Sequence, residues 1–150
     1  LYDSVEHLSE FLDKYPSSEH TDEIYRCLAN IYLNSNNYDK AINVLEDSDL
    51  SDDNIREQYQ KICFFKGVQL YNDLLYKDAI FYFDKAIQIH NNSELLFQTY
   101  YWKAEALYNL KSYGKALDFY QKLQDYIPIV HLSLKDHDHH HRHLTHTPYH

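Results

Sequence analysis

Glycine, proline and basic residues are scarce in this sequence of 150 residues, and methionine is absent. The chain holds only two glycines and three prolines. Both residues disfavour helix interiors, so their scarcity favours a helical chain. Basic residues number 14 against 23 acidic ones, which gives a net charge of −9. Because nucleic-acid phosphates require a basic face, this balance argues against nucleic acid as a partner.

Long apolar runs are also missing, and none approaches the roughly 20 residues that a membrane-spanning helix requires. We therefore expect no membrane insertion in this part of the chain. The sequence contains no glycine-rich phosphate loop, no H-E-x-x-H motif and no nucleophile elbow. These absences lead us to expect no catalytic residues and no cofactor.

The stretch from Tyr25 to Leu45 has the pattern of two amphipathic helices joined by a short polar turn. Apolar and aromatic residues recur in the first helix at the i, i+3, i+4, i+7 spacing of one buried face: Tyr25, Leu28, Ala29 and Tyr32. The turn is Ser35-Asn36-Asn37, and asparagine tolerates the left-handed backbone that such a turn can need. The second helix has Ala41, Ile42 and Leu45 on its inner face. The stretch therefore predicts a helical hairpin.

The same unit recurs twice further along the chain. Its copies are Cys63-x-x-Lys66-Gly67-x-x-Leu70 with Ala79-x-x-x-Phe83, and Tyr100-x-x-Lys103-Ala104-x-x-Leu107 with Ala116-x-x-x-Tyr120. A tyrosine also recurs near each turn at spacings of 36, 38 and 37 residues: Tyr2, Tyr38, Tyr76 and Tyr113. The pattern resembles the tetratricopeptide repeat, W-x2-L-G-x2-Y…A-x3-F. Lys66 and Lys103 stand where that pattern has leucine.

The resemblance implies an all-α fold, a tetratricopeptide-like α-solenoid of antiparallel helix pairs wound into a right-handed superhelix. We expect residues 1–128 to form the array, with a partial repeat at 1–18 and repeats at about 21–53, 54–92 and 93–128. Residues 129–150 are expected to be a separate His-rich tail, disordered or non-native. Because the chain begins one residue before a turn tyrosine, we expect it to be a piece of a longer protein.

In a tetratricopeptide array the first helices of successive repeats line a concave groove. The resemblance therefore implies a set of partner-binding residues on those helices: Arg26, Asn30, Asn34, Lys61, Phe64, Tyr71, Asn72, Tyr101, Glu105, Tyr108 and Asn109. Asparagine amides could hydrogen-bond the backbone of an extended peptide, and aromatic rings could anchor it. Two alternatives stay open, since asparagine also ends helices and aromatic residues also fill cores.

Arg26 and Asn30 resemble part of the carboxylate clamp by which some tetratricopeptide proteins hold the C-terminal peptides of chaperones. Phe65, Gln98 and Trp102 stand where further clamp residues would be expected, so the clamp is incomplete and chaperone tails are disfavoured.

The two cysteines and the terminal histidines are the remaining reactive groups. We expect Cys27 and Cys63 to be buried free thiols, with a disulfide open as the alternative in an oxidising compartment. His137 with His141, and His139 with His143, form i, i+4 pairs that could chelate zinc or nickel on a helix. Adventitious metal binding is our interpretation of this tail, with a metal carrier as the rival.

The favoured function is a non-catalytic scaffold that binds a partner peptide or helix in the concave groove. The alternative is a regulatory or targeting module of a larger enzyme, sensor or transcription regulator. The joint from Phe11 to Ser18 resembles the joint between repeats in bacterial envelope tetratricopeptide proteins. Cytoplasmic members of the family share this joint, so a location in the envelope or periplasm and one in the cytoplasm both stay open. The helix at 2–15 lacks a partner helix, so its apolar face could support self-association.

Overall fold

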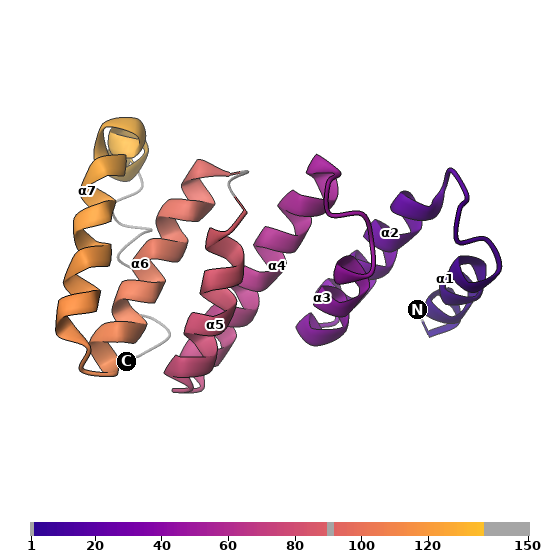
Figure 1. Cartoon of the computed structure of the whole chain (residues 1–150), viewed down its shortest axis with the longest axis horizontal. Helices are drawn as coiled ribbons and strands as arrows, with labels where there is room; N and C mark the ends of the chain where they lie inside the picture. The colour runs from indigo at the N-terminus through magenta and orange to yellow at the C-terminus, as the bar shows by residue number, and fades with distance from the viewer. Residues whose placement is uncertain (1, 90–91, 137–150) are drawn as a thin grey trace. The chain divides into compact units, whose positions relative to one another are not determined.

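The computed structural model of the chain describes residues 2–89 and 92–136 (Figure 1). These residues form seven helices and no strand: α1 (Tyr2–Lys14), α2 (Thr21–Asn34), α3 (Tyr38–Glu46), α4 (Asp53–Asn72), α5 (Tyr76–Ile87), α6 (Ser93–Asn109) and α7 (Tyr113–Asp136). The expected all-α fold of tetratricopeptide type is confirmed. The chain divides into two compact units, Leu1–Lys66 and Gly67–His150, with the boundary inside α4. Each unit is described by itself.

Three short turns, at 35–37, 73–75 and 110–112, join α2 to α3, α4 to α5 and α6 to α7. The middle residue of each turn has a left-handed backbone, with φ of 59° at Asn36 and 64° at both Leu74 and Lys111. The amide that follows it donates five residues back, from Asn37 to the Tyr32 carbonyl at 2.8 Å. The other two turns repeat this bond, from Leu75 to Leu70 and from Ser112 to Leu107, each at 2.9 Å. This hydrogen-bond pattern is the Schellman motif, so one hairpin geometry recurs three times.

Leu74 is an unfavourable residue for its turn, because a side chain in the left-handed region costs about 1–2 kcal/mol. Its side chain is 67% exposed and therefore contributes little packing. We expect Leu74→Gly to raise the free energy of unfolding by about 1 kcal/mol, measured by urea denaturation. Leu74→Ala removes the same side chain but keeps the backbone cost, so it should leave stability nearly unchanged. Equal effects of the two variants would contradict this explanation.

Small residues let the paired helices approach closely. In the first unit, Ala29 of α2 and Ala41 of α3 are fully buried, and Leu28, Ile42 and Leu45 fill the space around them. In the second unit, Gly67 of α4 lies against the ring of Phe83 in α5. A Cβ atom added to Gly67 would lie 2.4 Å from Cε1 of that ring. A larger residue at position 67 would therefore force the Phe83 ring or α4 to move.

The two lysines that replace leucine in the repeat pattern are mostly buried along their stems. Lys66 and Lys103 each keep only 15% of the side chain exposed. The Lys66 ammonium lies 3.4 Å from the Asp39 carboxylate, and the Lys103 ammonium lies 2.5 Å from that of Asp84. Lys103 also lies 4.3 Å from the centre of the Phe119 ring. The aliphatic stems thus fill leucine positions while the charges reach carboxylates at the helix surfaces.

One local prediction differs from the structure. We expected a disordered or non-native tail from residue 129, yet α7 continues through Pro128 to Asp136. Residues 129–136 contain no glycine and no further proline that would favour ending the helix. Where the array of repeats ends remains a prediction. The other repeat boundaries remain predictions.

Candidate functional site

The first unit has a cavity of about 220 Å³ on the side where α2 and α4 are neighbours. The residues that line it come from these two helices: Arg26, Asn30, Leu33, Asn54, Glu57, Gln58 and Lys61. Three of them, Arg26, Asn30 and Lys61, belong to the partner-binding set that we predicted from the sequence. The structure therefore brings these three together, although 35 residues separate the first from the last.

Gln58 is the most closely engaged of the cavity residues that the predicted set did not include. Its side-chain amide donates to the Arg26 carbonyl at 3.1 Å and to the Asn30 Oδ1 at 2.7 Å, so it ties α4 to α2. Its Oε1 atom is buried and has no hydrogen-bond partner among the described residues. Asn54, Gln58 and Lys61 follow the i, i+4, i+7 spacing of one helix face, and this polar stripe could have predicted the contact.

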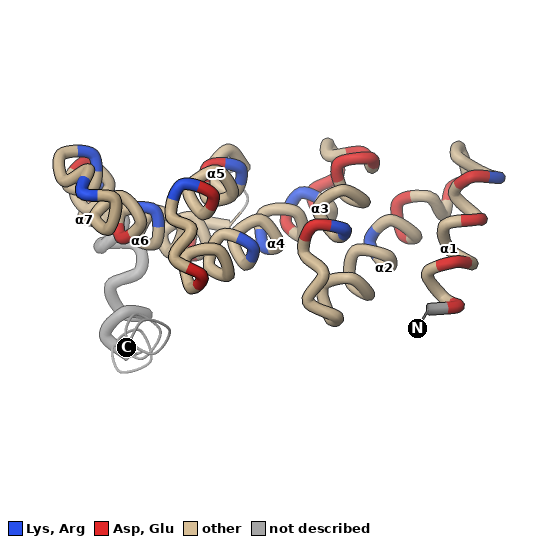
Figure 2. The backbone as a smooth tube through the Cα atoms, turned by 90° about the horizontal axis from the view of Figure 1, so that it is seen from below, with Lys and Arg blue, Asp and Glu red and all other residues tan. Residues whose placement is uncertain are grey.

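The cavity lining holds two basic side chains, Arg26 and Lys61, and one acidic side chain, Glu57, within an acidic part of the chain. Residues 1–66 include fourteen acidic and six basic residues, a net charge of −8. Figure 2 shows acidic residues (red) along α1 and basic ones (blue) at fewer positions. Arg26 and Lys61 are exposed, and neither forms an ion pair among the described residues. These two cations are therefore available to an anionic group of a ligand.

A second group of predicted residues gathers on α6 in the other unit. The Glu105 carboxylate accepts a hydrogen bond from the Tyr101 hydroxyl at 2.7 Å and one from the Tyr120 hydroxyl at 2.5 Å. The Asn109 amide donates to the Tyr71 hydroxyl and to the Glu105 carbonyl, both at 2.8 Å. Burial raises the pKa of Tyr120, and its hydrogen bond to Glu105 acts in the same direction. The Tyr120 hydroxyl therefore stays protonated and remains a donor.

Two predicted aromatic anchors do not lie at the surface. Tyr71 is only 4% exposed, and its ring lies 5.3 Å from Trp102 and 5.1 Å from Tyr76. Phe64 is only 6% exposed and lies beside Phe65. The alternative that these aromatic residues fill the core is correct for both positions. Burial, together with the nearby Glu105 carboxylate, raises the pKa of Tyr71.

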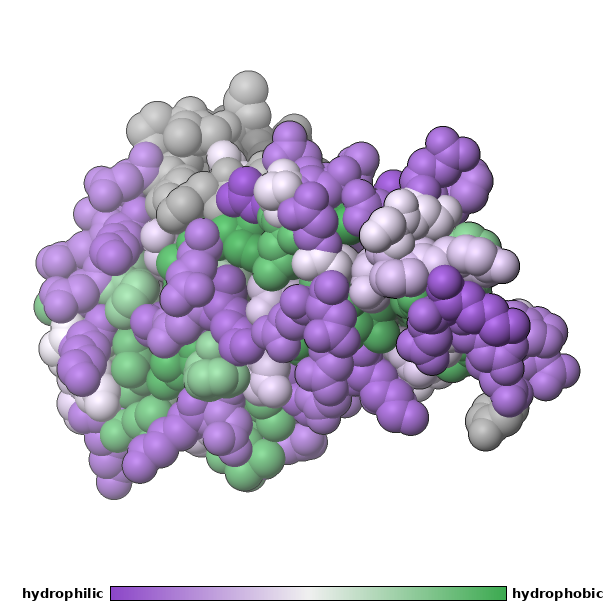
Figure 3. Space-filling model, turned by 45° about the vertical axis from the view of Figure 1, so that its right-hand side comes forward, coloured by the Kyte–Doolittle hydropathy of each residue, from purple (hydrophilic) through white to green (hydrophobic). Residues whose placement is uncertain are grey.

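Tyr108 differs from these buried rings, because 55% of it is exposed. It meets the Tyr113 ring edge-on at 5.2 Å, so the end of the α6–α7 hairpin presents two adjacent tyrosines. Other large hydrophobic side chains also reach the surface of the described residues: Tyr15, Leu74, Leu75, Phe81 and Leu117. Figure 3 shows hydrophobic areas (green) lying among hydrophilic ones (purple) on one face.

The three predicted asparagines Asn34, Asn72 and Asn109 are exposed, and each is the last residue of its helix. Their position fits the alternative of helix termination. Asn109 has in addition an amide already engaged with Tyr71 and Glu105. Contact of these residues with a partner remains a prediction.

A sequence model of the tetratricopeptide repeat family matches residues 28–54 and 97–129. The first match covers the end of α2 and all of α3, and the second covers most of α6 and α7. Both are hairpins that carry the Schellman turn described above. This is a tetratricopeptide repeat protein. No curated protein matches the chain in a sequence search.

Tetratricopeptide repeats generally serve as protein–protein interaction modules and are typically non-catalytic. In this tetratricopeptide protein, no helix within residues 2–89 and 92–136 is long and apolar enough to cross a membrane. Those residues also contain no group of three or more His, Cys, Asp and Glu side chains that could hold a metal ion. His137, His139, His141 and His143 lie outside the described residues.

The cysteines differ from the prediction in one respect. Neither forms a disulfide, and Cys63 is buried as expected, but Cys27 is exposed on α2. It precedes the buried Leu28 and Ala29, so it lies at the edge of the helix face that packs in the repeat core. The disulfide alternative is not found in the structure.

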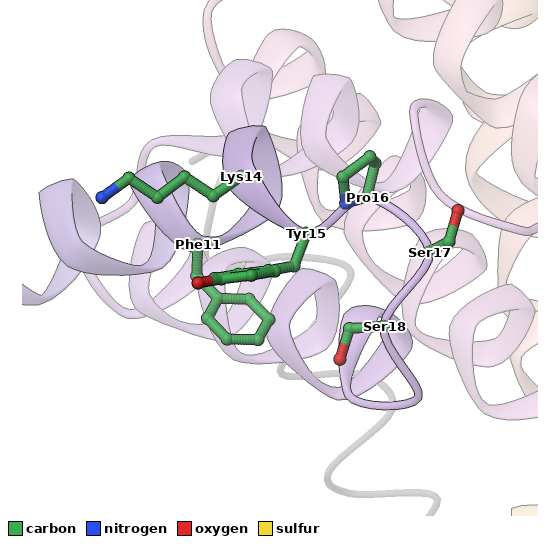
Figure 4. A pocket seen from close by; sticks show the side chains of 6 residues that line it. All are labelled: Phe11, Lys14, Tyr15, Pro16, Ser17 and Ser18. Atoms are coloured by element: carbon green, nitrogen blue, oxygen red, sulfur yellow. The ribbon is translucent and has the colours of Figure 1, made fainter.

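The joint between α1 and α2 holds an open hollow of about 590 Å³ (Figure 4). Phe11 and Tyr15 form its aromatic wall, with ring centres 5.0 Å apart and planes inclined by 48°. Lys14 and the segment 16–18 complete the lining. Val5, Leu8 and Phe11 on α1 are only partly buried. Self-association through this helix remains a prediction.

Proposed function

We propose that this protein is a non-catalytic scaffold that holds an extended or helical segment of a protein partner against the first helices of its repeats. The observation that carries the proposal is the cavity between α2 and α4, which Arg26, Asn30 and Lys61 line together. Interaction is the general role of tetratricopeptide repeats, and this cavity offers the chemistry for it.

The cavity offers two kinds of contact to a peptide. Arg26 and Lys61 can bind carboxylates of the partner, and a guanidinium can hold a carboxylate with two parallel hydrogen bonds. Gln58 engages the Asn30 Oδ1, which leaves the Asn30 Nδ2 hydrogens to donate to a peptide carbonyl. A partner segment with an acidic side chain beside exposed backbone carbonyls fits this arrangement best.

The surface of α6 supplies an aromatic contact in the second unit. The exposed Tyr108 ring gives a large contact area at a low cost in conformational entropy. Since Tyr113 supports its edge, the ring is held in place before a partner arrives. We therefore include Tyr108 with Arg26, Asn30 and Lys61 among the proposed contact residues.

Affinity capture with the full chain tests this proposal. The double variant Arg26→Glu, Lys61→Glu should lose at least about tenfold of the captured partner, because central charged contacts contribute about 2 kcal/mol or more. A control variant, Lys14→Glu, Lys40→Glu, makes the same change of net charge at two exposed lysines outside the cavity. The control should retain the partner. Equal recovery with both variants and the unmodified protein would contradict the proposal.

A further inference from the structure

Glu105 is held in one orientation by two tyrosines from different helices. The Tyr101 hydroxyl, one turn earlier on α6, donates to Oε1 at 2.7 Å, and the Tyr120 hydroxyl of α7 donates to Oε2 at 2.5 Å. The Glu105 side chain is partly exposed. Each carboxylate oxygen has a second acceptor position, so both oxygens can take a further hydrogen bond.

Comparison of the repeats indicates that the hairpin does not require these three polar groups. With a repeat of 37 residues, Glu105, Tyr101 and Tyr120 correspond to Val68, Phe64 and Phe83 of the preceding repeat. That repeat forms the same turn, with φ of 64° at Leu74 against 64° at Lys111, while using hydrophobic side chains at all three positions. Phe83 is fully buried. The carboxylate and the two hydroxyls that hold it are therefore additions to the fold.

The charge of Glu105 lacks a cation. Neither the described lysines and arginines nor the described histidines form an ion pair with it. Its two hydrogen-bond donors are tyrosine hydroxyls, and burial raises the pKa of Tyr120, which keeps that hydroxyl uncharged. A partly buried carboxylate with neutral partners favours the approach of a positive group, whose attraction is stronger here than in open water.

The surroundings suit a basic side chain with an aliphatic stem. Tyr108 is 55% exposed and lies one turn after Glu105 on α6, so its ring can pack against the stem or the cation itself. Asn109 is already engaged through its amide with Tyr71 and the Glu105 carbonyl, which keeps its own donors away from the carboxylate.

We propose that Glu105, oriented by Tyr101 and Tyr120, is a binding subsite for a lysine or arginine side chain of a protein partner. The inference rests on the proposed function and names the partner group that this surface of α6 would take. It differs from the α2–α4 cavity, whose cations call for a carboxylate.

The probe is a short capped peptide of glycine and serine with one central arginine, and its matched control carries citrulline, which has the same shape without the charge. Binding to the full chain is followed by amide chemical shifts and by the fluorescence of Trp102, the one tryptophan of the sequence. The ring centres of Trp102 and Tyr101 lie 5.9 Å apart, so the fluorescence of Trp102 is sensitive to binding at the subsite. We expect shifts on α6 around Glu105 with arginine, and at least tenfold weaker binding with citrulline.

Three variants separate the subsite from a merely structural role. Glu105→Gln keeps one acceptor oxygen for a tyrosine hydroxyl and replaces the other by an amide group that can donate to the second tyrosine oxygen. It should weaken arginine binding about tenfold with little change in thermal unfolding. Tyr120→Phe should weaken it by a smaller factor, because the carboxylate is then held by Tyr101 alone. Asp118→Asn removes an exposed carboxylate of α7 and should have no effect.

Two outcomes would overturn the inference, namely equal binding of arginine and citrulline peptides, or equal binding by Glu105→Gln and the unmodified protein. In the capture assay, loss of the partner with the Arg26 and Lys61 double variant but not with Glu105→Gln would leave the proposed function standing and reject the subsite. Retention with both variants would reject both proposals.

Discussion

Phe83→Ala is expected to lower the free energy of unfolding by about 3–5 kcal/mol, the usual range for removing a buried phenylalanine ring. Phe83 is fully buried and lies directly against Gly67, which has no side chain that could move into the space left behind. Because domains of this size are stable by only about 5–15 kcal/mol, the variant should unfold at much lower urea concentration.

Phe81 provides a matched control on the same helix. It is 57% exposed, and its main described contacts are the Tyr82 ring and the Lys85 ammonium, 5.0 Å from its ring centre. Phe81→Ala should cost less than about 1 kcal/mol in the same urea titration. Similar losses for the two variants would show that Phe83 does not fill the core of the hairpin as described.

Gly67→Ala is the second substitution for which we expect a large loss of stability, about 1–3 kcal/mol. The added methyl group would lie 2.4 Å and 2.6 Å from two ring carbons of Phe83, so α4 or the ring must move. The smaller side chain of Phe83→Leu should relieve this clash. We would measure the free energy of unfolding in urea for Gly67→Ala, Phe83→Leu and the double variant. The double variant should lose less of it than the sum of the losses of the two single variants.

The other glycine of the chain is the control for this substitution. Nothing lies within 4 Å of a Cβ atom added to Gly114 in the first turn of α7, and its φ is not positive. Gly114→Ala should thus raise stability by about 0.5 kcal/mol through the smaller entropy of the unfolded chain. We therefore expect the free energy of unfolding to fall in Gly67→Ala and to rise in Gly114→Ala. A fall of similar size in both variants would contradict the proposed close contact.

The sequence pattern predicted the hairpins well, because each repeat combines helical periodicity with a polar turn. Asn36 was expected to tolerate a left-handed backbone, and it adopts one. Leu74 and Lys111 adopt the same conformation without that local preference. Their turns are determined by the packing of the joined helices, and such tertiary contacts are not visible in a few residues of sequence.

The candidate site was predictable only in part for the same reason. The resemblance to the tetratricopeptide repeat implied that Arg26, Asn30 and Lys61 face a partner, and the structure places all three along one cavity. It could not distinguish Tyr71 from Tyr108, which occupy equivalent places in successive repeats. Tyr71 is covered by Trp102 from a later helix, whereas Tyr108 remains exposed, and this difference depends on contacts between distant residues.

The central claim is that the first helices hold the partner, and site-specific photocrosslinking tests it most directly. A benzophenone side chain is placed in the full chain at Asn54, which lines the α2–α4 cavity, or at Asn43, an exposed asparagine of α3. After capture of the partner and irradiation, we predict a crosslinked product from position 54 and none from position 43. A product from position 43 alone would contradict the account and would place the partner on the second helices.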